Sequence, residues 1–192
     1  MAHNGEYSEQ QLVRLVGRKD MHAMRELYNR HASYLTAVCS RYVPDSCLRD
    51  VLHDSFIKIF SSITSFDYRG DGSLRRWMTR ISVNESLRYL QKSRDLNFIQ
   101  YADELPDIAD DNEDNEDISL HDIPTDTIHC MIRDMPTGYR TVFSLYAIEG
   151  LGHKEIAETL GISISTSASQ YHRAKKMLAQ MISEHNLQSK RL

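Results

Sequence analysis

Side chains suited to contacting nucleic acid gather in two stretches of the sequence. The first, "LRRWMTRISVNESLRYLQKSR" (74–94), places apolar residues on one side of a helix and basic residues on the others. The second, "GISISTSASQYHRAKKML" (161–178), runs from hydroxyl and amide side chains into cations. Hydroxyls and amides can hydrogen-bond base edges, whereas Lys and Arg contact phosphates. Both stretches therefore predict contacts with nucleic acid.

The second stretch and the residues before it have the turn chemistry of a helix-turn-helix. A short helix is expected over 153–160, where the small side chain of Ala157 lets a neighbouring helix approach. Gly161 suits a left-handed turn, and Ser163 or Ser165 can cap the next helix. A plain helical hairpin with a polar face is the simpler alternative, but here the turn chemistry and the basic face coincide. The candidate DNA-contacting residues are Ser165, Thr166, Ser169, Gln170, His172, Arg173 and Lys176.

The sequence has no motif for catalysis or for metal or cofactor binding. It contains no phosphate-binding loop, GxSxG or HExxH. His121, His129 and Cys130 are close in sequence, but their spacing is irregular, and we interpret them as surface residues. We therefore expect a protein that is not an enzyme and that has no catalytic residue, metal site, cofactor or small-molecule substrate.

The sequence also lacks the features of an exported or membrane-spanning protein. Its N-terminus, "MAHNGEYSEQ", has no basic start followed by an apolar run, and no apolar stretch approaches the roughly 20 residues of a transmembrane helix. The three cysteines form no CxxC pair, which favours reduced thiols. We expect a cytoplasmic protein with no direct membrane insertion.

Composition and charge predict an all-α protein in two parts. Its 192 residues include only 8 Gly and 4 Pro, which favours helices over a sandwich or barrel. Residues 95–132 contain 12 Asp or Glu and no Lys or Arg, whereas the rest of the chain is basic. We therefore expect two small helical domains, at 8–94 and 124–185, joined by an acidic flexible linker at 95–123.

Apolar spacing and local signals place the helices of the first half. Asp20 can cap a helix that ends before Pro44, and the next helix is expected over 46–60. The polar loop "FDYRGDGS" then leads to Ser73, which can cap the basic helix. Trp77 falls on the apolar side of that helix, so we expect it in the core.

Together, the two halves resemble the extracytoplasmic-function (ECF) sigma factors of bacterial RNA polymerase. "EGLGHKEIAETLGISISTSASQYHRAKKML" resembles their helix-turn-helix domain, sigma region four, while "LRDVLHDSFIKIF" and "FDYRGDGSLRRWMTRISVNESLRYLQKS" resemble sigma region two. The resemblance covers about residues 10–94 and 124–184. It implies a factor that binds core RNA polymerase, directs promoter-specific transcription initiation and assists DNA melting, while the polymerase performs the chemistry.

The resemblance also implies partners and a docking helix. The partners are core RNA polymerase, through its β′ clamp helices and β subunit, promoter DNA and an anti-sigma factor. The helix over 46–60 would dock on the clamp helices. Its docking residues would be Asp50, His53, Asp54 and Lys58, of which the two acids are four apart and share a helix face. An ordinary solvated face is the alternative interpretation of these acids.

The same resemblance assigns the DNA contacts. The basic helix and its preceding loop would recognise and melt the minus-ten element, as opening DNA requires a pocket for a flipped base and cations for the backbone. Their candidate residues are Asp67, Tyr68, Arg69, Gly70, Asp71, Gly72, Ser73, Arg80, Asn84, Arg88 and Lys92. The second helix of the helix-turn-helix would read the minus-thirty-five element. Ser167, Ala168 and Gln170 differ from the residues frequent in the family, so we expect weaker phosphate attraction and a different base preference.

The resemblance also implies a role for the acidic linker. In the family the linker threads through the RNA exit channel, where a polyanion would imitate the transcript. A solubilising tether is the alternative interpretation of the linker.

The rival to the sigma-factor interpretation is a stand-alone helix-turn-helix transcriptional regulator. It would require a ligand pocket or a receiver domain in the first half, and the sequence pattern indicates neither.

Overall fold

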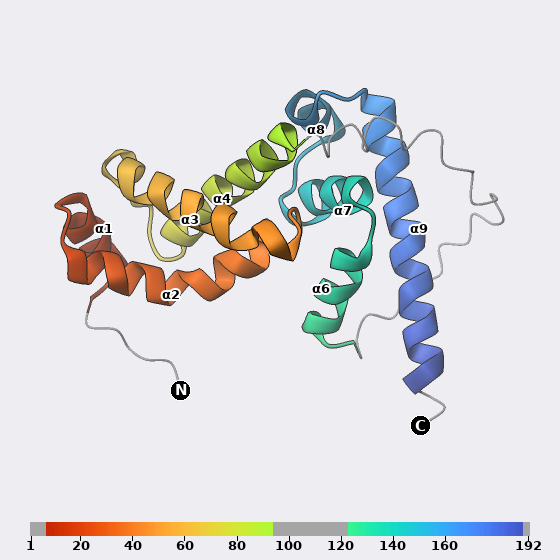
Figure 1. The fold of residues 1–192 in the computed structure, drawn as a ribbon, viewed down its shortest axis with the longest axis horizontal. Helices are drawn as coiled ribbons and strands as arrows, with labels where there is room; N and C mark the ends of the chain where they lie inside the picture. Colours follow the sequence, from red (N-terminus) through yellow and green to blue (C-terminus); the bar gives the residue numbers. More distant parts are fainter. Residues whose placement is uncertain (1–6, 94–122, 190–192) are drawn as a thin grey trace. The chain divides into compact units, whose positions relative to one another are not determined.

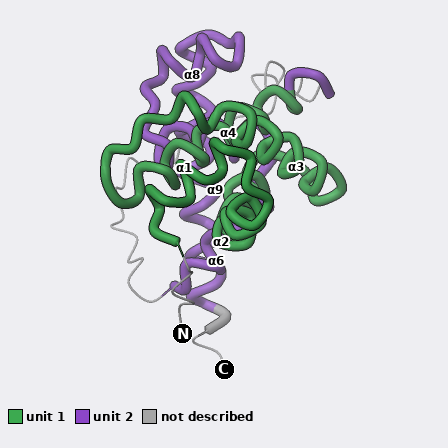
Figure 2. Tube along the Cα trace, turned by 90° about the vertical axis from the view of Figure 1, so that its left-hand side faces the viewer, with its two compact units in different colours: residues 1–90 green, residues 91–192 purple. Residues whose placement is uncertain are grey.

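The structure is a computed structural model, and it describes residues 7–93 and 123–189 of the chain. Every regular element in those ranges is a helix, and the chain divides into two compact units, residues 1–90 and 91–192 (Figures 1 and 2). The predicted all-α fold class is thereby confirmed. The predicted domain boundaries and the acidic linker stay predictions, because residues 94–122 lie outside the described ranges.

The helices of the N-terminal unit begin and end close to their predicted positions. The elements are α1 (Glu9–Gly17), α2 (Met21–Cys39), α3 (Asp45–Ser62), the 3-10 turn η1 (Ile63–Ser65) and α4 (Ser73–Lys92). As predicted, Asp20 caps α2, and its carboxylate accepts the N–H of Ala23 at 2.9 Å. Ser73 was predicted to cap α4 but is its first residue, and its hydroxyl accepts the N–H of Arg69 at 3.2 Å. The loop conformation, rather than a serine cap, therefore starts α4.

One apolar core joins the helices of this unit. Its fully buried members include Leu12, Val16, Leu27, Leu35, Phe56, Ile59, Leu74 and Met78. Each such side chain contributes about 1.5–3 kcal/mol when buried. Trp77 packs against this cluster, with its ring centroid 5.1 Å from that of Phe66, which confirms the predicted core position. Because the core holds one side of α4, the other side is left to polar residues.

The C-terminal unit is built around one long helix. Its elements are α6 (Thr125–Asp134), α7 (Thr137–Phe143), the π-helical turn η3 (Ser144–Ile148), α8 (His153–Leu160) and α9 (Ile164–Ser189). Helices α6, α7 and α8 all contact α9 (Figure 1). Ile132, Met135, Tyr139 and Ala174 form the core between them. Within the described residues, no helix combines the length and apolar content needed to cross a membrane.

Candidate polymerase and DNA interfaces

The exposed side of α3 carries the residues predicted to dock on the polymerase. These are Asp50, His53, Asp54 and Lys58, all of them exposed. Ile57 was not predicted, yet its side chain is 55% exposed and lies on the same face, four residues after His53 and three after Asp54. That spacing was the available signal in the sequence. Helix α3 thus presents carboxylates around an exposed isoleucine, the mixture of apolar and polar surface that protein interfaces use.

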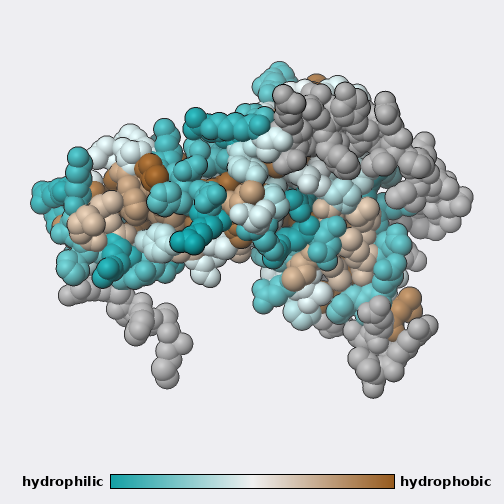
Figure 3. Space-filling model, in the orientation of Figure 1, coloured by the Kyte–Doolittle hydropathy of each residue, from teal (hydrophilic) through white to brown (hydrophobic). Residues whose placement is uncertain are grey.

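An open apolar pocket lies on α2 and the end of α3. Its lining residues are Met21, His22, Met24, Arg25, Tyr28, Asn29 and Phe60. The ring centroid of Tyr28 lies 4.6 Å from that of Phe56, which lies 5.7 Å from that of Phe60. Met21 is 75% exposed. Figure 3 shows brown apolar patches among the polar surface of this unit. Apolar side chains exposed together are typical of surfaces that bind other proteins.

The outer side of α4 carries the predicted minus-ten residues of that helix. Arg80, Asn84, Arg88 and Lys92 are all exposed and follow one another at intervals of four residues. Arg76 continues this stripe by one more interval and is also exposed. The guanidinium of Arg88 lies 3.6 Å from the carboxylate of Glu85, the acid on the same part of the helix. The result is a continuous basic face with the amide of Asn84 at its centre.

Hydrogen bonds within the loop before α4 organise its predicted residues. The Tyr68 hydroxyl donates to Asp71 at 2.8 Å, and the Arg69 guanidinium donates to Asp67 at 3.0 Å. The hydrogen bond to Asp71 raises the pKa of Tyr68 above its usual value, with smaller contributions from burial and the nearby carboxylates. Gly70 and Gly72 have φ angles of 96° and 78°, which residues with a side chain rarely adopt.

A residue outside the loop also holds it. The carboxylate of Glu9, in the first turn of α1, accepts the N–H of Gly72 at 3.2 Å. Glu9 was not among the site residues predicted from the sequence. No local pattern could have found it, because the two residues are 63 positions apart in the chain.

The predicted helix-turn-helix is present in the C-terminal unit. Gly161 has a φ of 69° and donates its N–H to the carbonyl of Ala157 at 2.9 Å, as expected where a helix ends at a residue in the left-handed conformation. Of the two candidate caps, Ser163 is the one used, since its hydroxyl accepts the N–H of Thr166 at 2.9 Å. The ring of His153 and the hydroxyl of Ser167 are 3.0 Å apart and share a hydrogen bond between α8 and α9. This bond fixes the rotation of α9 relative to α8.

The structure divides the candidate residues of α9 into an outer and an inner set. Ser165 and His172 are exposed, and Ser169, Arg173 and Lys176 are half-buried. Thr166 and Gln170 face inward instead, at 9% and 1% exposure. Ala168 and Lys175 are exposed and complete the outer face. The candidates share a polar residue type, but residue type does not determine which side of the helix a residue occupies. Thr166 and Gln170, four residues apart, lie together on the inner side.

An aromatic cluster supports this helix from the side. The ring centroid of Tyr146 lies 4.4 Å from that of His153 and 4.3 Å from that of Tyr171. The ring centroids of Phe143 and Tyr171 lie 6.0 Å apart. Each such aromatic pair adds about 0.5–1.5 kcal/mol to the burial of its rings. The cluster therefore ties α7 and the turn after it to α9.

The described residues hold no cluster of His, Cys, Asp or Glu arranged to bind a metal ion. Of the three residues close together in sequence, His129 is half-buried, Cys130 is exposed, and His121 lies outside the described ranges.

Two family models match the chain in the order in which the two helical units occur. Residues 27–95 match Sigma-70 region 2, and residues 125–178 match Sigma-70 region 4. The helices α3 and α4 lie within the first match, and α8, the turn after it and the first part of α9 lie within the second.

Curated and solved relatives cover nearly the whole chain. The ECF RNA polymerase sigma-E factor of Haemophilus influenzae is 31% identical over 188 residues, which are 91% of this chain and 95% of that protein. The sigma-E factor of Escherichia coli (strain K12) is 28% identical over 178 residues, covering 89% and 92%. A solved structure of the sigma factor RpoE with the anti-sigma factor NepR, from Bartonella quintana, is 18% identical, covers 83% of this chain and 96% of that chain, and has a TM-score of 0.45. From the family models and the first of these relatives, the chain belongs to the ECF RNA polymerase sigma factors.

Proposed function

We propose that this sigma factor recognises and melts the minus-ten element with α4 and the loop before it. The observation that carries this proposal is the exposed stripe on α4, with four cations around Asn84 on a helix whose other side is fixed in the core. Cations at that spacing neutralise successive phosphates, while an amide can bond a base edge. The loop, whose unusual backbone conformation Gly70 and Gly72 permit, supplies a pocket for a flipped base.

The minus-thirty-five element is assigned to the outer face of α9. Ser165, Ser169 and His172 contact base edges there, and Arg173 and Lys176 contact phosphates, with Lys175 as a further cation. Thr166 and Gln170 remain in the proposal only as residues that hold α9 in place, because their side chains are buried. Gln170 therefore contributes to recognition through the position of the helix.

Docking on core polymerase is assigned to α3. Asp50, His53, Asp54 and Lys58 contact the β′ clamp helices, and the exposed Ile57 lies among them as an apolar anchor. An acidic face that is also apolar at its centre fits a basic helical partner with an apolar stripe.

Further features are proposed from membership of the family. The factor also contacts the β subunit, is held by an anti-sigma factor, acts in the cytoplasm and performs no chemistry of its own. The domain boundaries at 8–94 and 124–185, and the passage of the acidic linker at 95–123 through the RNA exit channel, belong to the same proposal.

Binding to core RNA polymerase tests the proposal directly. The purified chain should comigrate with core polymerase on a native gel, whereas the double variant Asp50→Arg/Asp54→Arg should not. A matched control, Asp126→Arg/Asp134→Arg, reverses two exposed acids on α6 and should comigrate like the wild type. If the wild-type chain did not bind core polymerase but still bound DNA alone, a stand-alone transcriptional regulator would be the better interpretation of this protein.

A further inference from the structure

The first turn of α1 lies against the loop that precedes α4. Glu9 accepts the N–H of Gly72 at 3.2 Å, and the apolar side of α1, through Leu12 and Val16, is buried in the core of the unit. Helix α1 ends at Gly17, so it lies wholly outside residues 27–95, which match the sigma region-two model. This contact therefore brings a residue from outside the matched region to the proposed minus-ten loop.

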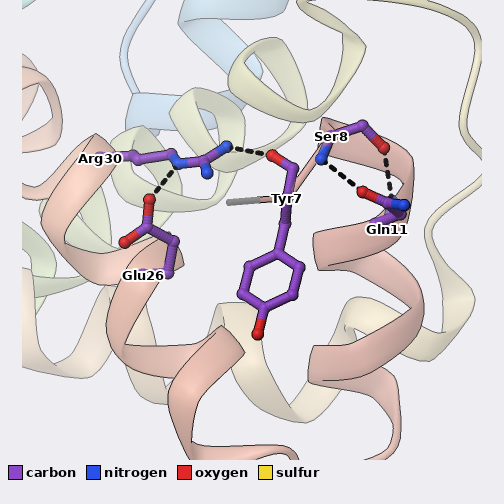
Figure 4. A network of polar contacts seen from close by, with 5 residues as sticks. All are labelled: Tyr7, Ser8, Gln11, Glu26 and Arg30. Atoms are coloured by element: carbon purple, nitrogen blue, oxygen red, sulfur yellow. Dashed lines mark hydrogen bonds and ion pairs between the residues drawn. The ribbon is translucent and has the colours of Figure 1, made fainter. Parts of the chain in front are cut away.

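The N-terminus of α1 is itself fixed in place by α2 (Figure 4). The guanidinium of Arg30 donates to the carbonyl of Tyr7 at 2.8 Å and to the carboxylate of Glu26 at 2.6 Å. Next along the chain, Ser8 and Gln11 form a capping box with hydrogen bonds of 2.8 and 3.2 Å. Glu9 thus stands between two anchored residues. These contacts fix the backbone from which the Glu9 side chain extends to the loop.

The chemistry at Gly72 suits a carboxylate. The N–H of Gly72 lies at the start of α4, where backbone donors have no partner within the helix and the helix dipole is positive. Asp71 and Arg76 lie near the same carboxylate with opposite effects on it. Burial raises the pKa of Glu9 above its ordinary value, although the Gly72 hydrogen bond and Arg76 lower it. The contact is therefore partly desolvated, which strengthens a charged hydrogen bond.

We propose that Glu9 is a positioning residue for minus-ten recognition, because it fixes the peptide between Asp71 and Gly72 and so the shape of the loop. The inference rests on the minus-ten role proposed above for the loop. Gly72 has a φ of 78° and no side chain to restrict it, so its backbone needs an outside contact to hold one conformation. Losing that contact lets the loop sample other shapes. The preference among bases should then weaken more than the binding of polymerase.

The experiment uses the full chain with core RNA polymerase on a promoter library randomised at the minus-ten element. Transcripts are sequenced to give the preference for each base. In Glu9→Ala, the preference at one or more positions should fall by about fivefold, the effect of losing roughly 1 kcal/mol of hydrogen bonding. Gln10→Ala, an exposed neighbour in the same turn of α1, should match the wild type.

Two conservative variants separate positioning from stability. Glu9→Gln keeps an oxygen that can accept the Gly72 N–H, so it should retain the wild-type preference. Glu9→Asp keeps the charge, but its side chain is one methylene too short to reach the Gly72 N–H. It should therefore lose base preference as Glu9→Ala does, and it provides the test if the alanine variant folds poorly. A wild-type base preference in both Glu9→Ala and Glu9→Asp, at whatever total yield, would overturn the proposal.

Asn84→Ala, measured on the same library, distinguishes this inference from the function on which it rests. A changed preference in Asn84→Ala with none in the Glu9 variants would reject the role of Glu9 alone. An unchanged preference in every variant, Asn84→Ala included, would reject the minus-ten assignment of α4 and its loop, and the role of Glu9 with it.

Discussion

The two helices proposed to contact DNA differ in the charge of their exposed faces. On α4, Arg76, Arg80, Arg88 and Lys92 surround the amide of Asn84. On the first two turns of α9, the exposed or half-buried side chains are neutral, namely Ile164, Ser165, Ala168, Ser169 and Tyr171, and cations appear only further along the helix. Although each helix is packed on a core of its own, one presents mainly charge and the other mainly neutral side chains.

The two faces should therefore contribute differently to the binding of promoter DNA. Contacts between cations and phosphates supply most of the binding free energy and weaken with salt, but they carry no sequence information. Hydroxyls and imidazoles in the major groove can distinguish bases while contributing little charge. We therefore expect the α4 face to dominate the salt dependence of promoter binding, and the minus-thirty-five contacts of α9 to depend less on salt.

The largest expected effect comes from removing the centre of the α4 face. Asn84→Ala with Arg88→Ala should abolish promoter opening while leaving core polymerase binding intact, because neither side chain belongs to the α3 face. The lost amide contact alone is worth about 1–3 kcal/mol. Permanganate footprinting of a promoter selected from the library would measure the opening. Gln10→Ala with Arg14→Ala, two exposed residues of α1, serves as the control, and undiminished thymine reactivity in the α4 variant would contradict the assignment.

The next largest effect tests the inner and outer sides of α9. Gln170→Lys should destabilise the C-terminal unit by about 3 kcal/mol or more, because it places an unpaired charge at a position that is 1% exposed. His172→Lys, two residues further along and exposed, should change stability by less than about 0.5 kcal/mol.

Two spectroscopic signals allow that comparison within one chain. The chain has a single tryptophan, Trp77, which lies in the N-terminal unit, so its fluorescence reports on that unit alone. Far-ultraviolet circular dichroism reports on both units. In urea, Gln170→Lys should shift part of the dichroism transition and leave the tryptophan transition unchanged. Equal stability of the lysine variants at 170 and 172 would show that Gln170 is not buried in solution.

Sequence alone predicted the features that depend on local chemistry. The left-handed Gly161, the helix over 153–160 and the caps Asp20 and Ser163 all follow from neighbours within four residues. Features that depend on tertiary contacts were missed. Glu9 reaches a loop 63 residues away, and the side of α9 on which Gln170 lies is set by packing against other helices. A residue's polarity indicates what it can bond, but only the packing decides what it faces.

A cation added to α9 should narrow the difference between the two faces. Ala168 is exposed on that helix, so Ala168→Lys should add a phosphate contact and raise affinity for minus-thirty-five DNA severalfold at low salt. The slope of log affinity against log salt should become steeper by about 0.9, the value for one further phosphate. Titrations at several salt concentrations with core polymerase present would measure it. The control, Glu184→Lys, replaces a negative charge by a positive one at an exposed position near the end of α9 and should leave the slope unchanged.

The smallest effect concerns the stability of the N-terminal unit as the pH falls. Burial, and then the positive charges of Arg75 on α4 and Arg30 on α2, lower the pKa of His31 below its ordinary value of 6.5. Below pH 6.5 the unfolded chain therefore binds a proton that the folded unit does not, so the free energy of unfolding should decrease. One such group can contribute at most about 1.4 kcal/mol per pH unit. In His31→Gln, this part of the decrease should vanish. Urea titrations followed by Trp77 fluorescence at pH 7.5 and 5.5 would show it, and an equal decrease in both proteins would mean that other groups control the acid sensitivity of this unit.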